Sequence, residues 1–411
     1  MKHQNACRCC KSKNLKPFID LGSSPPSNSY LSKDGLSASE TWYPLRVKVC
    51  ADCWLAQTDD FANREEFFND NYAYFSSMSG GWLAHAKLYC ENVINRFSLD
   101  TNSLVVEIAS NDGYLLKNFV EKDIPCLGIE PSKSTADAAR KIGVDTLDEF
   151  FGNDLAEQLK RQDKRADLVI GNNVFAHVPD IIDFAKGINT LLKDEGVVTL
   201  EFPHLKKLID ELQFDTVYHE HYSYLSLIAT MKIFELSGLR VFDVEELSTH
   251  GGSLRVYGCK TNALHQNTER FEQVLASEKS GGLDSYQYYE NMMARIEDAK
   301  NKALKFLIEE NEQGRKVAGY GAAAKGNTFL NYSGIRSDLI FEIYDKALAK
   351  QGTCTPGMRI PIRSPEELRK SSPDTVVILP WNIASEIVED FKDMKKNGTK
   401  FVRLLPEVEY L

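Results

Sequence analysis

Short apolar runs alternate with amphipathic segments through the middle of the chain, the pattern of a parallel sheet covered by helices. Most of these runs are rich in valine, isoleucine and leucine and end in polar residues, as buried parallel strands do. The predicted strands are residues 104–108, 126–130, 167–171 and 197–202. Two further runs, 239–244 and 253–259, flank the sequence THGG and predict an antiparallel hairpin that closes this sheet.

A second, smaller α/β unit is predicted after this hairpin. Residues 284–310 carry apolar side chains at steps of three and four, which predicts a long helix. The apolar runs that follow predict a second parallel sheet from residues 316–320, 339–344, 375–379 and 401–405. Residues 81–97 predict a helix ahead of the first sheet. We therefore divide the chain into residues 1–70, 71–262 and 263–411.

The first of these regions contains two Cys-x-x-Cys pairs, Cys7 with Cys10 and Cys50 with Cys53. Four thiolates in two short knuckles match the tetrahedral ligand set of a structural zinc ion. Cys9 is a spare thiol, and a redox pair or metal-free thiols are the alternatives. Because four sulfur ligands leave no open coordination position, we expect this zinc to stabilise the fold and to take no part in catalysis.

The composition narrows the class of partner. Of the 411 residues 43% are apolar and 26% are charged, and the formal net charge is −10. An acidic chain is poorly suited to track along nucleic acid, whereas a small anionic substrate needs only a few local cations. We find no apolar run long enough to span a membrane and expect a cytoplasmic protein. Three regions supply their own cleft, so we expect a monomer or a weak dimer.

A nucleotide-sized cofactor is predicted at the ends of the first sheet's strands. The first strand and its turn read EIASNDG, and the second strand ends in Glu130, placed to accept hydrogen bonds from ribose hydroxyls. Residues 143–151 (GVDTLDEFF) are a candidate wall for an adenine. The literal GxGxxG pattern is absent, which disfavours a nicotinamide dehydrogenase. The candidate cofactor-binding residues are Glu107, Ala109, Asn111, Gly113, Glu130, Asn172 and Asn173.

Two further segments are candidates for an anionic substrate. The sequence GYGAAAKGNT follows a predicted strand, and a small-residue turn at a helix N-terminus offers backbone N–H groups to phosphate, with Lys325 adding a charge and Asn327 a neutral donor. The hairpin sequence THGGSLRV holds His250, Ser253 and Arg255. Arg255 is predicted either to reach a diphosphate or to pair with an acidic residue within the sheet.

The densest group of titratable residues lies between the two sheets, in the segment QFDTVYHEHY (213–222). Single histidines are more often structural, and we expect this of His204 and His219. A metal site is disfavoured because the HExxH spacing is missing. The density of acids, histidines and tyrosines in ten residues nevertheless predicts a site.

Taken in order, the two Cys-x-x-Cys pairs and the segments EIASNDG, GIEPS, GNNVFAHVPD, EFPHL, QFDTVYHEHYSYLS, THGGSLRV and VAGYGAAAKGNTFLN resemble the nucleotide-sugar C-methyltransferases. The resemblance covers nearly the whole chain. It implies a class I S-adenosylmethionine (SAM)-dependent methyltransferase fold at 71–262, a zinc-binding module at 1–70 and a Rossmann-like nucleotide-sugar-binding domain at 263–411. It also implies SAM as cofactor and transfer to carbon 3 of a dTDP-linked 4-keto-6-deoxysugar.

The resemblance further implies which residues line the sugar pocket. They are His177, Tyr218, Glu220 and His221, together with one tyrosine of the N-terminal aromatic loop, Tyr72 or Tyr74. We assign Tyr72 to catalysis, and Tyr74 and Ser76 to the substrate. Methylation of carbon requires a proton to be removed beside a carbonyl, and His221 suits this role because imidazole titrates near neutrality. Tyr218 and His177 are candidate donors to the keto oxygen, and Glu220 is expected to orient His221 or to bind a sugar hydroxyl.

Two alternatives stay open at this point. A methyltransferase acting on oxygen or nitrogen would share the fold, but it needs no carbon acid and would leave the HEH cluster (residues 219–221) without a clear role. A zinc module that binds RNA or protein would make the chain a nucleic-acid or protein methyltransferase, although no basic stripe lies near the cysteine pairs.

Overall fold

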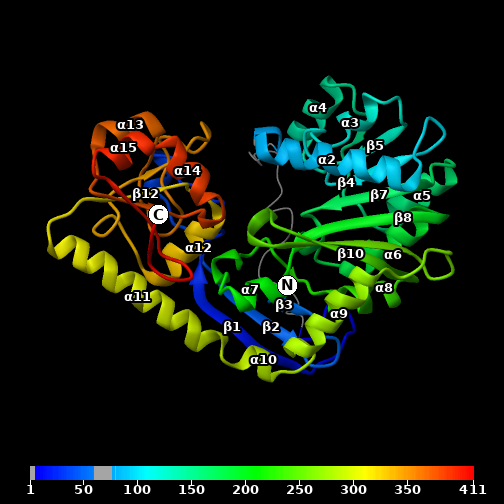
Figure 1. Ribbon diagram of the computed structural model, residues 1–411, viewed down its shortest axis with the longest axis horizontal. Coiled ribbons are helices and arrows are strands. Elements are labelled where there is room, and N and C mark those ends of the chain that lie inside the picture. Colours follow the sequence, from blue (N-terminus) through cyan, green and yellow to red (C-terminus); the bar gives the residue numbers. More distant parts are fainter. Residues whose placement is uncertain (1–4, 60–75, 79) are drawn as a thin grey trace.

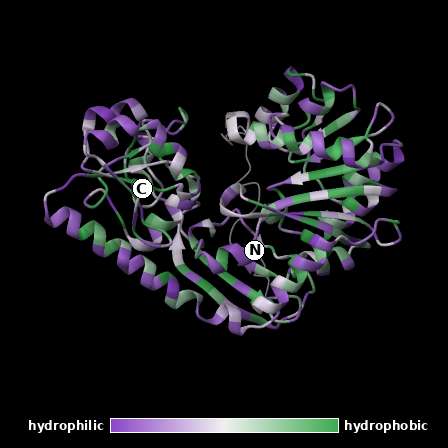
Figure 2. Cartoon of the chain, viewed as in Figure 1, coloured by the Kyte–Doolittle hydropathy of each residue, from purple (hydrophilic) through white to green (hydrophobic). Residues whose placement is uncertain are grey.

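The structure is a computed structural model that describes residues 5–59, 76–78 and 80–411. Two α/β lobes lie side by side, and a small sheet with a long helix runs beneath them (Figure 1). The central strands of both lobes are largely apolar, whereas apolar and polar residues alternate along the long helix (Figure 2). No helix among the described residues is both long enough and apolar enough to cross a membrane.

The larger lobe is built on a seven-stranded sheet. Its strands are β4 (Val105–Ile108), β5 (Cys126–Ile129), β6 (Thr146–Leu147), β7 (Ala166–Asn172), β8 (Leu192–Pro203), β10 (Leu239–Leu247) and β11 (Ser253–Lys260). Their order is β10-β11-β8-β7-β4-β5-β6, and β11 runs antiparallel to both of its neighbours. Numbered one to seven along the chain, this order is 6-7-5-4-1-2-3 with the seventh strand reversed. The predicted class I methyltransferase fold with its closing hairpin is confirmed.

Helices cover both faces of this sheet. One face packs against α2 (Gly80–Phe97), α3 (Lys117–Val120) and α4 (Lys133–Lys141), and the other against α5 (Asn153–Arg161), α6 (Ile181–Leu191), α8 (Leu227–Glu235) and α9 (Glu269–Gly281). The predicted helix at 81–97 is therefore present as α2. Its buried stripe is Ala86, Tyr89, Cys90 and Val93, whereas Leu88 faces solvent.

The smaller lobe contains a six-stranded sheet. Its strands are β12 (Val317–Tyr320), β13 (Ile343–Tyr344), β14 (Ile362–Arg363), β15 (Thr375–Ile378), β16 (Lys400–Arg403) and β17 (Glu409–Tyr410), in the order β14-β13-β12-β15-β16-β17. The sheet is parallel except at β17. Its helices are α12 (Ala324–Ser333), α13 (Pro365–Ser371), α14 (Ala384–Asp390), α15 (Lys392–Lys396) and the 3-10 turn η6 (Trp381–Ile383). The predicted second sheet is confirmed, although the strand expected at 339–344 begins only at Ile343.

The zinc-binding module adds a third sheet, in which one strand comes from elsewhere in the chain. It contains β1 (Leu15–Ser24), β2 (Tyr43–Cys50), β3 (Ala56–Thr58) and the turn η1 (Asp34–Ser37). Its fourth strand is β9 (Ser223–Tyr224), which begins two residues after His221. Below it, α10 (Gln287–Glu290) and α11 (Met292–Glu312) replace the single helix expected at 284–310. The HEH segment is thus tied to the zinc module through the backbone.

The region before β9 is the junction of the three parts. It contains α7 (Leu205–Asp210) and η4 (Phe214–Thr216), and other short turns are η2 (Ser76–Met78), η3 (Phe175–His177) and η5 (Thr249–Gly251). Apolar side chains of α7 and η4 share one core with strands of the zinc module, with α11 and with the smaller lobe. Burial of apolar area on three sides holds this region in place, so it is a fixed platform for the residues that follow.

Candidate functional site

A cavity of about 410 Å³ is lined by the larger lobe, the smaller lobe and the zinc module. Most of the predicted site residues line it. They are Ser76, Ala109, Asn111, Glu130, Asn172, Asn173, His177, Tyr218, Glu220, His221, His250 and Lys325. Glu107, Gly113, Ser253, Arg255 and Asn327 do not, and Tyr72 and Tyr74 lie outside the described residues.

The turn after β4 forms one end of the cavity. Ala109 and Asn111 have φ values of 57° and 51°, which wrap the backbone around the Glu130 carboxylate. That carboxylate accepts hydrogen bonds from the backbone N–H groups of Asn111 (3.0 Å) and Ser132 (2.9 Å). Burial raises the pKa of Glu130. Each oxygen keeps a further lone pair, so the carboxylate can accept hydrogen bonds from hydroxyl groups in the cavity.

Gly113 has a different role from the predicted one. A Cβ atom there would lie 3.1–3.2 Å from the side chains of Val144, Ala139 and Ile142, and φ is 78°. The glycine is therefore required for packing of the turn against α4 and the segment after it. Glu107 does not line the cavity either. Its side chain is buried, and burial raises its pKa well above the usual range.

The other side of the cofactor end is formed by the strand ends of β7 and β11. The Asn173 amide donates a 3.1 Å hydrogen bond to Nε2 of His250, whose ring packs edge-on against Trp82. Oδ1 of Asn173 is buried and, within the described part of the chain, has no hydrogen-bond partner. A buried acceptor in the same cavity as Glu130 suits a ligand that carries ammonium and hydroxyl donors, as SAM does. The residues present therefore fit this cofactor.

Arg255 is buried below the cavity and does not line it. Its guanidinium contacts the carboxylates of Glu201 (2.6 Å) and Glu245 (3.1 Å) and lies over the ring of Tyr89. Burial opposes the charge on Glu201, but the His85 hydrogen bond and Arg255 outweigh it and lower the Glu201 pKa to about 2. The structure thus gives the within-sheet pairing and not the diphosphate contact.

Ser253 and Asn327 are structural for similar reasons. The Ser253 hydroxyl donates to the Thr249 carbonyl oxygen at 3.1 Å, within the hairpin turn. The Asn327 amide donates to the carbonyl oxygen of Ser27 at 2.7 Å and joins α12 to the zinc module. Both side chains are buried. The substrate role expected of these two residues is not supported by their positions.

His177 and His221 are each held in one tautomer when neutral. Nδ1 of His221 contacts the carbonyl oxygen of Thr216, and Nδ1 of His177 contacts that of Glu220, each at 2.9 Å. A carbonyl oxygen only accepts, so Nδ1 carries the proton and Nε2 carries the lone pair. The ring centroids lie 4.7 Å apart, and the Tyr218 ring centroid lies 3.9 Å from that of His221.

Burial also controls the charge of this group. It lowers the pKa of His177 to about 4 and that of His221 well below its usual value, where the neighbouring His177 adds to the effect. Both rings are therefore neutral at physiological pH. The expected structural histidines lie outside the cavity. His204 contacts the buried Glu278 carboxylate at 2.7 Å, and His219 donates to the Tyr43 carbonyl oxygen at 3.2 Å.

Glu220 is contacted by a residue that the sequence did not single out. The side-chain amide of Asn28, from the zinc module, donates to both carboxylate oxygens at 2.8 and 3.0 Å. Burial raises the pKa of Glu220 to about 7, while this hydrogen bond opposes the rise. The carboxyl group is therefore poised to gain or lose a proton near neutrality.

The smaller lobe brings two cations to the cavity. Nζ of Lys325, at the start of α12, contacts the amide oxygen of Asn382 at 2.7 Å and lies over the Trp381 ring. Nζ of Lys350 donates to the Ala322 carbonyl oxygen at 2.8 Å. Burial lowers the pKa of Lys325. An anion between the two lysines would offset the cost of burying this charge.

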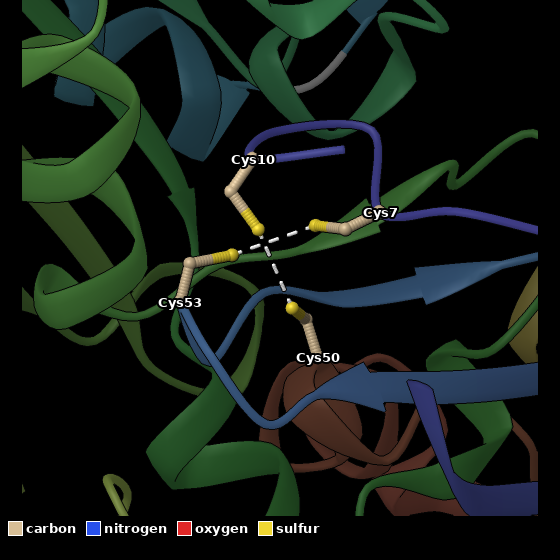
Figure 3. A group of neighbouring side chains, drawn as sticks. All are labelled: Cys7, Cys10, Cys50 and Cys53. Atoms are coloured by element: carbon tan, nitrogen blue, oxygen red, sulfur yellow. Dashed lines mark hydrogen bonds between the residues drawn. The ribbon is translucent and has the colours of Figure 1, made fainter. Parts of the chain in front are cut away.

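The zinc ligands converge as predicted. The sulfur atoms of Cys7, Cys10, Cys50 and Cys53 all lie within 4.8 Å of one another (Figure 3). Cys7 and Cys53 are 3.4 Å apart and Cys10 and Cys50 are 3.5 Å apart. Tetrahedral zinc with Zn–S bonds of about 2.3 Å needs similar separations. The four thiols fit a structural zinc ion that would fix both knuckles.

Several residues that line the cavity were not predicted from the sequence. They include Asn28, Trp82, Tyr114, Ser132, Thr216 and Lys350. Phe150 and Phe151, in the segment proposed as an adenine wall, do line the cavity. Asn28 lies in a Pro/Ser/Asn-rich stretch and Lys350 in the unremarkable segment YDKALAKQG, so neither carries a local signal of function.

The sheet topology and the Glu130 end of the cavity define a SAM-dependent methyltransferase, and the four clustered cysteines add a structural zinc site. Comparison with family models agrees along the chain. Residues 7–68 match a "Putative zinc binding domain", 82–244 a "Methyltransferase domain" and 248–406 a "C-methyltransferase C-terminal domain".

The chain is 33% identical over 401 residues to the C-methyltransferase NovU of Streptomyces niveus, an alignment that covers 98% of this chain and 95% of that protein. The protein therefore belongs to this family of SAM-dependent C-methyltransferases.

Solved methyltransferase structures match smaller parts of the chain. A magnesium protoporphyrin IX methyltransferase from Synechocystis with bound SAH is 15% identical, with 44% of this chain and 84% of that chain covered and a TM-score of 0.34. A SAM-dependent methyltransferase from Clostridium acetobutylicum is 13% identical, with 42% and 90% covered and a TM-score of 0.34.

Proposed function

We propose that this protein transfers the methyl group of SAM to carbon 3 of a dTDP-linked 4-keto-6-deoxysugar, with His221 as the base that forms the carbon nucleophile. The observation that carries the proposal is the neutral His221, whose Nδ1–H is committed to the Thr216 carbonyl, in the same cavity as Glu130. The ring is held so that only Nε2 has a lone pair to take a proton.

The chemistry follows from what carbon methylation needs. A carbon beside a ketone has no lone pair, so a base must remove its proton and leave an enolate. In the proposal, Nε2 of His221 takes this proton and becomes the imidazolium. Bound SAM supplies a methyl group that is already activated as a sulfonium. The enolate carbon then attacks that methyl group while the methyl–sulfur bond breaks, and the ketone re-forms.

The groups around His221 support this role. Burial keeps the imidazole neutral at physiological pH, so Nε2 holds a lone pair that can take a proton, while the same lowering of the pKa makes His221 a weaker base than an imidazole in water. Tyr218, whose ring lies against His221, is the proposed donor to the enolate oxygen. His177 is not assigned this role, because its one ring proton, on Nδ1, is committed to the Glu220 carbonyl oxygen. Glu220, whose pKa burial raises to about 7, is the proposed contact for a sugar hydroxyl. Tyr72 or Tyr74 remains the proposed aromatic contact from the N-terminal loop.

The nucleotide is proposed to lie toward the smaller lobe. Lys325 and Lys350 both line the cavity there, and Lys325 sits in the first turn of the ten-residue helix α12. Two cations near a helix N-terminus suit a diphosphate, which carries negative charge on both phosphates. A nucleotide sugar would then bridge from these lysines to His221, across the region joining the two lobes.

The experiment is proton exchange in deuterium oxide. We expect a dTDP-4-keto-6-deoxyhexose to lose the NMR signal of its carbon 3 proton with enzyme and S-adenosylhomocysteine, and to gain a methyl group with SAM. His221→Asn keeps a donor for the Thr216 carbonyl but removes the base. We expect it to slow both exchange and methylation by ~10²- to 10⁴-fold, with SAM affinity within a few-fold of wild type.

The control is His219→Asn, a neighbouring histidine that faces the Tyr43 carbonyl outside the cavity, which should retain most of the turnover. Wild-type exchange in His221→Asn would reject its role as base. Exchange without methylation in the wild-type enzyme would keep the base but reject this sugar.

A further inference from the structure

The first zinc knuckle contains a buried arginine that points away from solvent. Arg8 lies between Cys7 and Cys10, and only 2% of the residue is exposed. One terminal nitrogen of its guanidinium donates to the carbonyl oxygen of Thr58 at 3.1 Å and the other to that of Pro179 at 3.0 Å. The guanidinium also lies 5.0 Å from the ring centre of Tyr222. A charged side chain buried in this way joins parts of the chain that are far apart in sequence.

Those parts lead to two of the histidines that line the cavity, His177 and His221. On one side, the Thr58 hydroxyl donates to the backbone carbonyl oxygen of His221 at 3.0 Å. The Thr58 backbone N–H donates to the Tyr222 carbonyl oxygen at 3.1 Å. On the other side, Pro179 lies two residues after His177. The guanidinium therefore bridges two segments: the one that carries His177, and strand β3, whose Thr58 is hydrogen-bonded to His221.

The same two segments also contact each other directly. The Tyr222 backbone N–H donates to the Ala176 carbonyl oxygen at 2.9 Å, and the His177 ring contacts the Glu220 carbonyl. These bonds set the 4.7 Å separation of the His177 and His221 rings. Arg8 adds a further link between these segments, because its guanidinium donates to the Thr58 carbonyl of β3 and to the Pro179 carbonyl in the loop after η3.

We propose that Arg8 is a positioning residue, which fixes the His177 and His221 segments relative to each other and is itself fixed by the zinc knuckle. This inference rests on the proposed function, since it gives His221 its role as the base. It assigns the zinc module a part in catalysis without any contact between metal and substrate. The zinc ligands hold the backbone on both sides of Arg8, and Arg8 in turn holds the cavity.

An arginine is required here for a geometric reason. Its planar fork presents two nitrogens at a fixed spacing and can satisfy two carbonyls at once, whereas a lysine ammonium is a point charge on a flexible stem. The backbone N–H of Arg8 also donates to the side-chain oxygen of Gln57 at 2.8 Å, which fixes the start of the side chain against β3. We therefore expect Arg8→Lys to retain only part of the effect.

The test compares Arg8→Met, Arg8→Lys and Thr58→Val with the wild-type enzyme. Zinc content is measured by mass spectrometry, SAM affinity by calorimetry, and kcat and KM with the dTDP-4-keto-6-deoxyhexose. We expect Arg8→Met to keep one zinc per chain and wild-type SAM affinity while kcat falls ~10- to 100-fold, as for a displaced catalytic group. The kcat of Arg8→Lys should lie between those of Arg8→Met and the wild-type enzyme. Thr58→Val, which loses only the hydroxyl donor to His221, should lower kcat to a smaller extent.

A second readout does not need the sugar. In protein labelled with ¹⁵N-histidine, the imidazole signals of His177 and His221 should shift in Arg8→Met, while that of His265, stacked on Phe242, stays unchanged. Wild-type kcat and unshifted signals in Arg8→Met would overturn the proposal. If Arg8→Met loses zinc, Arg8→Lys decides, and wild-type kcat with unshifted imidazole signals in that variant would also overturn the proposal.

The two proposals fail in different ways. An active His221→Asn enzyme would reject the base, whatever Arg8→Met does. An inactive His221→Asn enzyme with a fully active Arg8→Met enzyme would reject the positioning role alone. If the sugar is not a substrate, the imidazole signals still test whether Arg8 fixes the two rings, and unshifted signals would reject it.

Discussion

Replacement of Glu220 by glutamine should make the protein more stable at alkaline pH while impairing its activity. The Glu220 residue is 5% exposed, and burial raises its pKa to about 7 from an ordinary value of 4.5. The glutamine side chain keeps the shape and one of the two oxygens that accept from Asn28, and an amide group replaces the other. The largest effect of the substitution on stability is the removal of the cost of ionising a buried acid.

The sign and size of this change in the free energy of unfolding follow from the pKa values of Glu220 in the folded and unfolded states. Because the folded pKa is the higher one, the unfolded chain releases its proton first as the pH rises. The folded state is therefore not penalised below about pH 4.5, loses stability between pH 4.5 and 7, and carries the full penalty above pH 7. The difference of 7 − 4.5 = 2.5 in pKa corresponds to ~3 kcal/mol at 1.36 kcal/mol for each pKa unit.

The assay is urea unfolding at pH 4.5 and at pH 8, followed by tryptophan fluorescence. We expect Glu220→Gln and wild type to unfold at nearly the same urea concentration at pH 4.5, and the variant to gain ~3 kcal/mol at pH 8. Glu312→Gln, at the exposed end of α11, is the matched control and should change little at either pH. A variant that is no more stable than wild type at pH 8, or one with the same gain at both values, would refute the reasoning.

Two further perturbations test other parts of the site. Cys50→Ser should reduce the zinc content below one per chain and destabilise the zinc module, because removing a ligand removes folding free energy; a zinc content that stays at one, measured by mass spectrometry, would contradict the ligand set. Lys325→Met should raise KM for the nucleotide sugar by ~10-fold or more through the loss of a charge-assisted contact of ~1.5–3 kcal/mol, with SAM affinity unchanged. Lys279→Met, at the exposed end of α9, is its control, and an unaltered KM in Lys325→Met would remove this lysine from the proposed diphosphate site.

Much of the architecture could be predicted because its signals are local. Buried parallel strands are continuous apolar runs, so the strands of the large sheet other than the short β6, and the core of the second sheet, follow from the sequence. The two knuckles place sulfur atoms by their spacing alone, and Figure 3 shows the four thiols together. Glu130 and the Asn172–Asn173 pair were found because strand ends in a parallel sheet meet at one edge.

The tertiary structure alone decided which distant groups meet. Nothing near Asn28 in the sequence indicates that it contacts Glu220, and nothing near Arg8 indicates that it bridges Thr58 and Pro179. Arg255 appeared equally suited to a ligand or to an ion pair, and the burial of Glu201 beside it decided the matter. Periodicity and spacing report a residue's covalent neighbours, whereas the partner of a buried polar group is chosen by packing among segments far apart in the chain.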